Sequence, residues 1–426
     1  MKLGYSIIAL NIALFGVLAP SAMAQSANGN PFFRHRFVAV TERAHPEFDP
    51  VPIHAGAFMI NASLNLAAMF NDNIFAQTNN KTSDALLELT PQIGVTSNWS
   101  SNALNAGLLV NRRQYLKNDS ENVTNYQGYV GGRLDVTRAF AISAQANAGR
   151  FTESRYAPSA VGVAAEPVHY EATGGLIQAN YQFNRIQIEG TLNVTKNDYH
   201  DVRTIAGPST PSVVIDQDFR DATQTNVGGR FSYAISPDVA VYVLARHGDV
   251  SYDQSLPDRD STRNFYQVGA NFELAAPFRG DIAVGYLQTK QKSGRDFSGP
   301  AVDGRLQWFP TEITTVTFSA QRTVFDPGLL NSSVAFDTAV GVHVDHELRR
   351  NIVLFGDLGY EDQDFQDIDR KDKITSLSAG VGYKLNRRAR VDLAYAYRNQ
   401  DSSGVATPFG PKFSDNTVSV TLRLFP

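Results

Sequence analysis

Residues 186–195 read IQIEGTLNVT: every second residue is apolar or glycine, and the residues between them are polar. The same period of two recurs in at least three more stretches, which are Thr314–Gln321, Val334–Asp345 and Leu377–Leu385. Successive side chains of a β-strand point to opposite faces, so each stretch predicts a strand with one apolar and one polar face. Helical periodicity is scarce. The longest apolar runs after residue 24, such as Val239–Ala245, have seven residues, whereas a membrane-spanning helix needs about 20.

Short turns alternate with long polar loops between the predicted strands. The short turns are expected at Asn98–Asn102, Thr137–Ala139, Asn184–Arg185, Ser236–Asp238, Ala276–Phe278, Pro310–Glu312, Leu348–Asn351 and Asn386–Arg388. The long loops are expected at Asn71–Thr82, Leu116–Thr124, Glu153–Val168, Asp201–Asp221, Asp253–Arg263, Ser293–Gly299, Asp326–Ser332, Asp362–Asp372 and Asn399–Ser414. Eight turns separate nine hairpins. This alternation predicts an all-β, antiparallel transmembrane outer-membrane barrel of about 18 strands, with short turns in the periplasm and long loops outside the cell.

A soluble β-propeller or β-helix is the rival fold, because both are exported folds with regular strands. Residues 58–426 give nine units of 41 residues each, which is close to the length of a propeller blade. A blade contains four short strands, however, whereas each unit here holds two long ones. No repeated blade motif is present. The pattern therefore favours the barrel.

The composition excludes several classes of protein. The formal net charge is −4, from 38 Lys and Arg against 42 Asp and Glu, so the basic excess typical of nucleic-acid binding is absent. The chain has no cysteine, which excludes a disulfide scaffold and a cysteine-bound metal. The 26 Phe and 17 Tyr residues argue against disorder. Only 19% of the residues are charged, below the usual quarter, which fits a large β structure in contact with lipid.

The first 24 residues predict a Sec signal peptide. Lys2 is followed by the largely apolar stretch Ile7–Leu18, and Ala22-Met23-Ala24 fits the cleavage rule. Three segments follow from this: a signal peptide at residues 1–24, an N-terminal segment at 25–57, and the barrel at 58–426. The middle segment has several prolines and mixed charges, and it is too short for a plug domain. It is expected either to stay in the periplasm or to enter the lumen.

Candidate catalytic and metal-binding sites are scarce in this sequence. His343 and His346 are three residues apart, so on a strand they point to opposite faces and cannot form a zinc pair. No Ser/His arrangement for a hydrolase is recognisable. Asp216, Asp218 and Asp221 mark one acidic loop and Asp362–Asp369 another, but neither has EF-hand spacing. We expect solvated surface there, near anionic lipopolysaccharide with divalent ions as bridges, and calcium binding at Asp362–Asp369 stays open as the alternative. The sequence predicts no enzyme, no cofactor and no metal site.

The polar faces of the strands are predicted to line the lumen. They carry charges of both signs in near balance, together with many Asn and Gln, and most of the charges are expected to form ion pairs across neighbouring strands. The candidate lumen-lining residues are Glu88, Arg113, Arg133, Glu189, Arg230, Arg246, Glu273, Asp303, Arg305, Asp337, His343, Asp357, Lys384, Asp392 and Arg398. Eighteen strands leave an aqueous lumen unless a loop fills it.

The region Val38–Asn111 carries a resemblance to a known family. Thr41-Glu42-Arg43 and residues 46–50 (PEFDP) come before the first predicted strand, and residues 71–76 (NDNIFA), 81–84 (KTSD) and 97–99 (SNW) follow it. In these residues the chain resembles the outer-membrane β-barrel porin family that is often associated with exopolysaccharide export in Gram-negative bacteria. The resemblance continues diffusely to the end of the chain, and it implies a conduit for a secreted polysaccharide.

Three functions stay open on the sequence alone. The first is a porin-like conduit for polysaccharide export, the second is a general diffusion porin for small hydrophilic solutes, and the third is a closed structural or surface-binding barrel. All three predict the outer membrane of a Gram-negative bacterium. The expected partners are outer-membrane lipid and lipopolysaccharide and the barrel-assembly machinery. Under the first function, a periplasmic polysaccharide-export protein joins them. No nucleic-acid partner is expected.

Overall fold

The computed structural model describes residues 36–206, 211–254, 258–274, 277–404 and 412–426. The predicted signal peptide and the first part of the predicted N-terminal segment lie outside the described residues. The described residues contain three short 3-10 helices, η1 (Val40–Glu42), η2 (Asp119–Glu121) and η3 (Asp218–Arg220). The described part of the chain contains no helix with the length and apolar character needed to cross a membrane.

Strands make up nearly all the regular structure. They are β1 (Ile53–Ala55), β2 (Phe58–Asn71), β3 (Asp84–Ser97), β4 (Ala103–Tyr115), β5 (Val123–Asp135), β6 (Phe140–Thr152), β7 (His169–Phe183), β8 (Ile186–Tyr199), β9 (Val202–Arg203), β10 (Val214–Ile215), β11 (Ala222–Ser236), β12 (Val239–Tyr252), β13 (Ser261–Glu273), β14 (Phe278–Gln291), β15 (Phe297–Thr311), β16 (Thr314–Phe325), β17 (Ala335–Arg349), β18 (Ile352–Phe365), β19 (Arg370–Asn386), β20 (Ala389–Ser403) and β21 (Phe413–Leu424).

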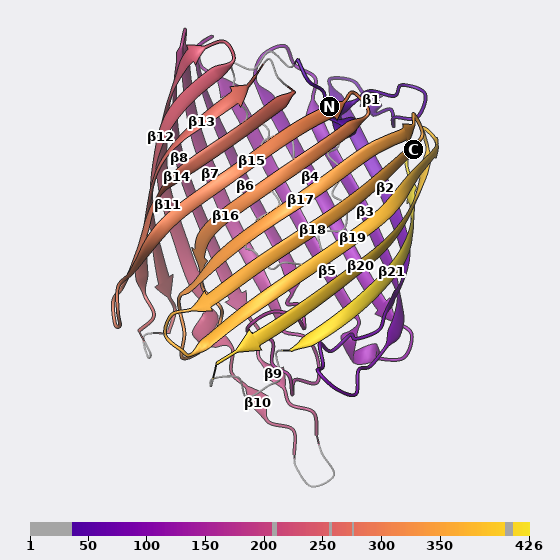
Figure 1. The fold of residues 1–426 in the computed structure, drawn as a ribbon, viewed down its shortest axis with the longest axis vertical. Helices are drawn as coiled ribbons and strands as arrows, with labels where there is room; N and C mark the ends of the chain where they lie inside the picture. Colours follow the sequence, from indigo (N-terminus) through magenta and orange to yellow (C-terminus); the bar gives the residue numbers. More distant parts are fainter. Residues whose placement is uncertain (1–35, 207–210, 255–257, 275–276, 405–411) are drawn as a thin grey trace.

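Eighteen of these strands form a closed antiparallel barrel, as the sequence predicts (Figure 1). Neighbours in sequence are neighbours in the sheet, with β8 pairing to β11. The last strand returns to the first, and β21 pairs with β2 from Leu64↔Leu424 to Asn71↔Thr417. The two remaining pairings are short hairpins, β1 with β2 and β9 with β10. Closure leaves the barrel without an open edge, which a sheet in lipid requires.

Each barrel strand has one apolar and one polar face. On β17, Val340 is 48% exposed, whereas Asp345 is only 3% exposed. Val342 pairs with Phe318 on β16 and with Leu358 on β18, and both partners are exposed. Val342 therefore belongs to the outer, lipid-facing side, and the adjacent His343 faces the lumen. The alternation in the sequence predicts this assignment.

The two ends of the barrel differ in the length of their connections. The turn after β7 is 184–185 and the turn after β19 is 387–388, whereas the loop after β6 is 153–168 and the loop after β8 is 200–221. The short turns, β1 and the end of β21 share one end, and the β9–β10 hairpin projects from the other (Figure 1). The first end is periplasmic and the second is extracellular by the usual barrel topology.

Two predicted loops are much shorter in the structure. The predicted loop Asp362–Asp372 shrinks to residues 366–369, and Asn399–Ser414 shrinks because β20 continues to Ser403. Polar residues on both faces of these strand ends hide the period of two, and the sequence therefore predicts loops there. The outer face of β18 and β19 carries Asp362 and Lys371 at this level, which form an ion pair. These strands therefore extend past the apolar band into water while keeping their pairing.

The two faces of β17 give a direct test of the register. Val342→Arg should destabilise the barrel by about 2–4 kcal/mol, because it places a charge in the lipid-facing band. His343→Arg should be tolerated, since a cation would still lie between Asp345 and Asp357. Urea unfolding of the refolded barrel, followed by its gel mobility, measures both changes. Equal losses, or the reverse ranking, would contradict the register.

Candidate functional site

The structure places all fifteen predicted lumen residues on the inner face of the barrel, in phase with the buried polar positions of their strands. Several form ion pairs across or along the wall. Arg113 Nε lies 2.8 Å from Glu88 Oε2 on the adjacent strand, and Arg390 Nε donates to Asp392 Oδ1 at 2.6 Å. Such pairs leave little net field along the wall. Whether each of the fifteen residues contacts a solute remains a prediction.

His343 is held between two carboxylates. Its Nδ1 lies 2.6 Å from Asp357 Oδ1, and its Nε2 lies 2.9 Å from Asp345 Oδ2. Ser378 Oγ donates to the other Asp357 oxygen at 2.7 Å. This resembles the parts of a hydrolytic triad, but the Ser378 hydroxyl bonds the carboxylate rather than the imidazole. The arrangement therefore ties β17, β18 and β19 together and does not activate a nucleophile.

The N-terminal segment, here residues 36–49, is bound inside the periplasmic end of the barrel. The backbone N of Arg36 donates to Glu273 Oε1 at 2.7 Å, and the ring of Phe37 stacks on Phe309 at 5.3 Å. Val40 is buried, and its backbone N donates to Thr315 Oγ1 at 3.0 Å. Glu273, Phe309 and Thr315 belong to β13, β15 and β16. The first half of the segment therefore lies along the β13–β16 side of the lumen.

The second half of the segment continues towards β19. Arg43 and His45 both approach Glu347 Oε2 at 3.3 Å, and Asp49 pairs with Lys384 at 3.3 Å. The Pro46 carbonyl accepts a hydrogen bond from Arg387 Nε at 2.6 Å. Lys384 and Glu347 are themselves buried. The segment thus fills the β13–β19 side of the periplasmic end and leaves the side of β2–β5 and β21 free of these contacts.

The loop 153–168, between β6 and β7, crosses the extracellular mouth. The ring of Tyr156 stacks on Phe413 of β21 at 5.2 Å, and its hydroxyl accepts a hydrogen bond from Asn71 of β2 at 2.9 Å. The Pro158 carbonyl accepts one from Arg370 of β19 at 3.3 Å. Four strands, β2 to β5, separate β6 from β21 around the wall. We call this segment the mouth loop.

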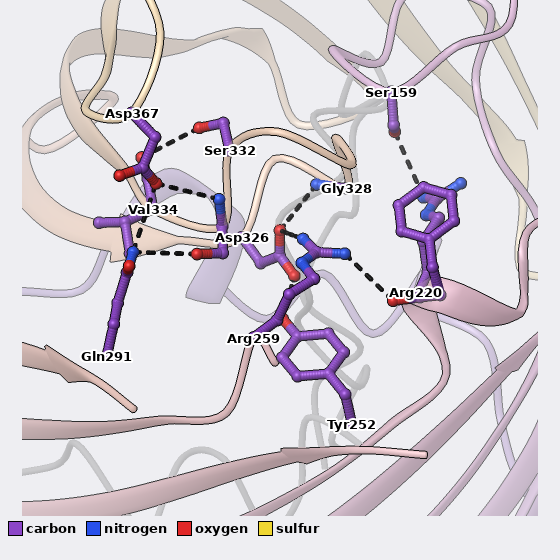
Figure 2. A network of polar contacts seen from close by, with 12 residues as sticks. Ser159, Arg220, Tyr252, Arg259, Gln291, Asp326, Gly328, Ser332, Val334 and Asp367 are labelled. Atoms are coloured by element: carbon purple, nitrogen blue, oxygen red, sulfur yellow. Dashed lines mark hydrogen bonds and ion pairs between the residues drawn. The ribbon is translucent and has the colours of Figure 1, made fainter. Parts of the chain in front are cut away.

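Two buried arginines stand beside the mouth loop: Arg220 binds the loop itself, and Arg259 binds the Phe219 carbonyl of η3 and Asp326 after β16 (Figure 2). Arg220 pairs with Glu153 at 2.5 Å and also bonds Ser159, and Arg220 and Glu153 side chains are only 5% and 9% exposed. Arg259 pairs with Asp326 at 2.8 Å. Burial disfavours the charged form of Arg220, but the carboxylate of Glu153 outweighs burial and raises the pKa of the guanidinium. The guanidinium of Arg220 therefore stays protonated.

A chamber of about 370 Å³ remains between the mouth loop and the inner wall. It begins at Tyr156 and Ile74 beneath the mouth loop and reaches Arg390 and Arg423, which stand near the periplasmic ends of β20 and β21. Amide and hydroxyl side chains supply much of its lining; six of them are Asn65, Asn71, Asn125, Thr417, Ser419 and Thr421. We call this chamber the side passage.

Sequence reasoning found the charged wall of the side passage, including Glu88, Arg113 and Asp392, but it missed the loop residues. Tyr156 and Arg220 lie in stretches that carry no periodic pattern. Their partners are 85 and 67 residues away in the chain. The length of Glu153–Val168 was the only signal that could have marked the mouth loop, because long loops within compact structures are often functional.

One acidic loop brings three carboxylates together. Oxygens of Asp201, Asp216 and Asp218 lie within 4.8 Å of one another, and all three residues are exposed. Desolvation and the neighbouring carboxylates of Asp216 and Asp201 raise the pKa of Asp218. The other acidic stretch, Asp362–Asp369, is split between β18 and the connection that follows it. It therefore does not form a single loop.

The ion pair between Arg220 and Glu153 is expected to hold the mouth loop against η3. Arg220→Met should weaken docking of the loop by about 3–5 kcal/mol, because it leaves Glu153 buried and unpaired. Hydrogen exchange measured by mass spectrometry should then rise across residues 153–168. Arg203→Met, an exposed position on β9 near the same loop, is the matched control and should change nothing. Unaltered exchange in Arg220→Met would contradict the assigned role.

Comparison with known proteins finds one family and many distant structures. The family described as "Putative beta-barrel porin 2" matches residues 45–425. The search of curated proteins found no match. Among solved structures, a BenF-like porin from Pseudomonas fluorescens is 12% identical, with 86% of this chain and 99% of that chain covered and a TM-score of 0.48. OccK2 (OpdF) from Pseudomonas aeruginosa is 11% identical, with 86% and 98% covered and a TM-score of 0.48. OccAB3 from Acinetobacter baumannii is 13% identical, with 86% and 99% covered and a TM-score of 0.46.

Proposed function

We propose a function for this chain from the fact that it belongs to the "Putative beta-barrel porin 2" family. It is a porin-like β-barrel of the outer membrane of a Gram-negative bacterium and not an enzyme. The proposal concerns what it conducts. We infer that it passes small hydrophilic solutes through the side passage, with a size limit set by the mouth loop and the N-terminal segment.

The side passage is the observation that carries the proposal. Its volume is about 370 Å³, at the lower end of the range of pockets that enclose small molecules. The mouth loop narrows it from the extracellular end, through the contacts of Tyr156 with β2 and β21. The N-terminal segment borders it at the periplasmic end, since Asp49 binds Lys384, the cross-strand neighbour of Arg390. A barrel of this width would otherwise leave a broad aqueous channel.

The lining of the passage suits an uncharged, hydroxyl-rich solute. Its charges are paired, as in Glu88 with Arg113 and Asp392 with Arg390, so neither sign is favoured strongly. Amide and hydroxyl side chains can exchange hydrogen bonds with a solute as readily as with water. Each net hydrogen bond is worth only about 0.5–1.5 kcal/mol. A solute can therefore move along the wall without being held tightly at one point.

Export of a polysaccharide remains a prediction from the sequence resemblance. A continuous glycan chain would have to displace the mouth loop or the N-terminal segment, and both are held by buried ion pairs. That cost argues for small solutes over a polymer. The third alternative, a closed barrel with a structural or surface-binding role, requires that the side passage conduct nothing.

Liposome swelling separates the three functions. Proteoliposomes that carry the refolded barrel should swell in solutions of small neutral sugars, and the rate should fall steeply as the sugars lengthen. The absence of swelling with any sugar would favour the closed barrel. Loss of surface polysaccharide in a strain that lacks this gene, with its synthesis intact, would favour export.

Deletion of residues 36–49 tests the role assigned to the N-terminal segment. Its removal should raise single-channel conductance and admit longer sugars, because it empties the β13–β19 side of the lumen. The heat-dependent gel mobility of the variant shows whether the barrel still assembles. Alanine replacement of Phe37 alone, which removes only the stacking on Phe309, is a milder variant. Conductance unchanged by the deletion would contradict the role.

A further inference from the structure

Two carboxylates stand side by side on the inner face, near the extracellular ends of β17 and β18. Asp337 is 2% exposed and Glu361 is 4% exposed. The side chain of Asp337 meets that of Glu361 directly. Apart from this mutual contact, both oxygens of Asp337 and Oε2 of Glu361 are buried without a hydrogen-bond partner among the described residues.

The neighbouring buried charges neutralise this pair only in part. On β19, Asp372 is bound by Arg370 at 2.6 Å. On β20, the guanidinium of Arg398 is attracted to Glu361 and also to Asp415 on β21, so its single positive charge is shared between two carboxylates. The lysines at this level of β19, Lys371 and Lys373, lie on the outer face of that strand. Among the described residues, no Lys or Arg side chain forms an ion pair with Asp337 or Glu361, so negative charge is left over there when both carboxyls are ionised.

The side chain of Gln363 lies beside the pair of Asp337 and Glu361. Gln363 is the cross-strand partner of Asp337 and is 7% exposed. Its amide nitrogen donates to Glu361 Oε1, which fixes the orientation of the amide. Its amide oxygen is buried and has no partner among the described residues. Gln363 thus adds a buried oxygen to this part of the wall, beside the two of Asp337 and the one of Glu361.

Burying two ionised carboxylates that share only part of one counter-charge is costly, since each buried ion loses several kcal/mol of hydration. The cost falls if a cation binds between them. Carboxylate and amide oxygens are the ligands that Ca²⁺ prefers, and Ca²⁺ tolerates irregular geometry in which water completes its coordination of six to eight oxygens. Extracellular calcium sites built from few charged ligands bind in the range of about 10⁻⁴–10⁻³ M.

We propose that Asp337, Glu361 and Gln363 form a Ca²⁺ site inside the barrel wall, below the extracellular mouth. This departs from the sequence prediction that the chain has no metal site. The ion would join β17 to β18 at the level where both strands leave the apolar band. The inference does not depend on what the side passage conducts.

The exposed cluster of Asp201, Asp216 and Asp218 provides a matched control. Its three carboxylates are close together, but they are in contact with solvent and carry no unpartnered buried oxygen. Surface carboxylates of this kind bind Ca²⁺ weakly and add little to stability. The control variant is therefore the double substitution Asp201→Asn and Asp216→Asn.

The experiment uses the full barrel refolded in detergent without lipopolysaccharide, so that lipid phosphates cannot supply the cation site. Calorimetric titration with Ca²⁺ should find one site, and the thermal transition should rise with Ca²⁺ above its value in EDTA. Asp337→Asn with Glu361→Gln should weaken binding by about tenfold or more and abolish the Ca²⁺-dependent shift. In EDTA the same variant should unfold at a higher temperature than the parent, because the repulsion is gone.

Several outcomes would overturn the proposal. One is a parent protein that shows neither heat of binding nor a Ca²⁺-dependent shift. Another is a shift that survives the Asp337→Asn and Glu361→Gln double substitution, or that disappears in the control variant. A third is a transition that depends on pH but not on Ca²⁺, which would mean that the two carboxyls share a proton. If the double variant fails to refold, Gln363→Leu provides the second test, with weaker Ca²⁺ binding expected.

Discussion

Every backbone N–H and C=O group of this chain that lies in the hydrocarbon layer must find its partner within the protein, and the rest of the structure depends on that requirement. An open sheet would leave two edges unpaired in lipid, where each unsatisfied group costs several kcal/mol. The pairing of β21 with β2 removes both edges. Once the barrel is closed, the alternation of side chains is fixed as well, because adjacent residues must face lipid and lumen in turn.

The closed wall creates a second requirement, which is to accommodate the charged side chains that face inwards. Several of these charges are paired with a neighbour on the same or an adjacent strand. His343, between Asp345 and Asp357, and Arg113, 2.8 Å from Glu88, are examples. Pairing reduces the cost of burial and also keeps the lumen from selecting strongly for one sign of ion. Asp337 and Glu361 depart from this pattern, which makes them informative.

The segments at the two ends of the barrel set how much of its lumen stays free. A wall of eighteen strands leaves more space than its inner side chains fill. The mouth loop and the N-terminal segment occupy much of that space from opposite ends. Both are held by ion pairs that are largely removed from water, such as Arg220 with Glu153 and Arg43 with Glu347. The side passage lies beside β2–β5, β20 and β21, away from the contacts of the N-terminal segment.

The sequence by itself determined the barrel, the number of its strands and the face on which Val342 and His343 lie, because a period of two is a local property of the chain. It also placed the mouth loop at its observed bounds, residues 153–168. Only the tertiary structure decided what that loop touches, since Pro158 meets Arg370 across 212 residues of sequence. The same holds for Arg36 with Glu273, 237 residues apart, and for the cluster of Asp337, Glu361 and Gln363. A repeating pattern can be read from neighbouring residues, but such contacts depend on how the closed wall brings distant strands and loops together.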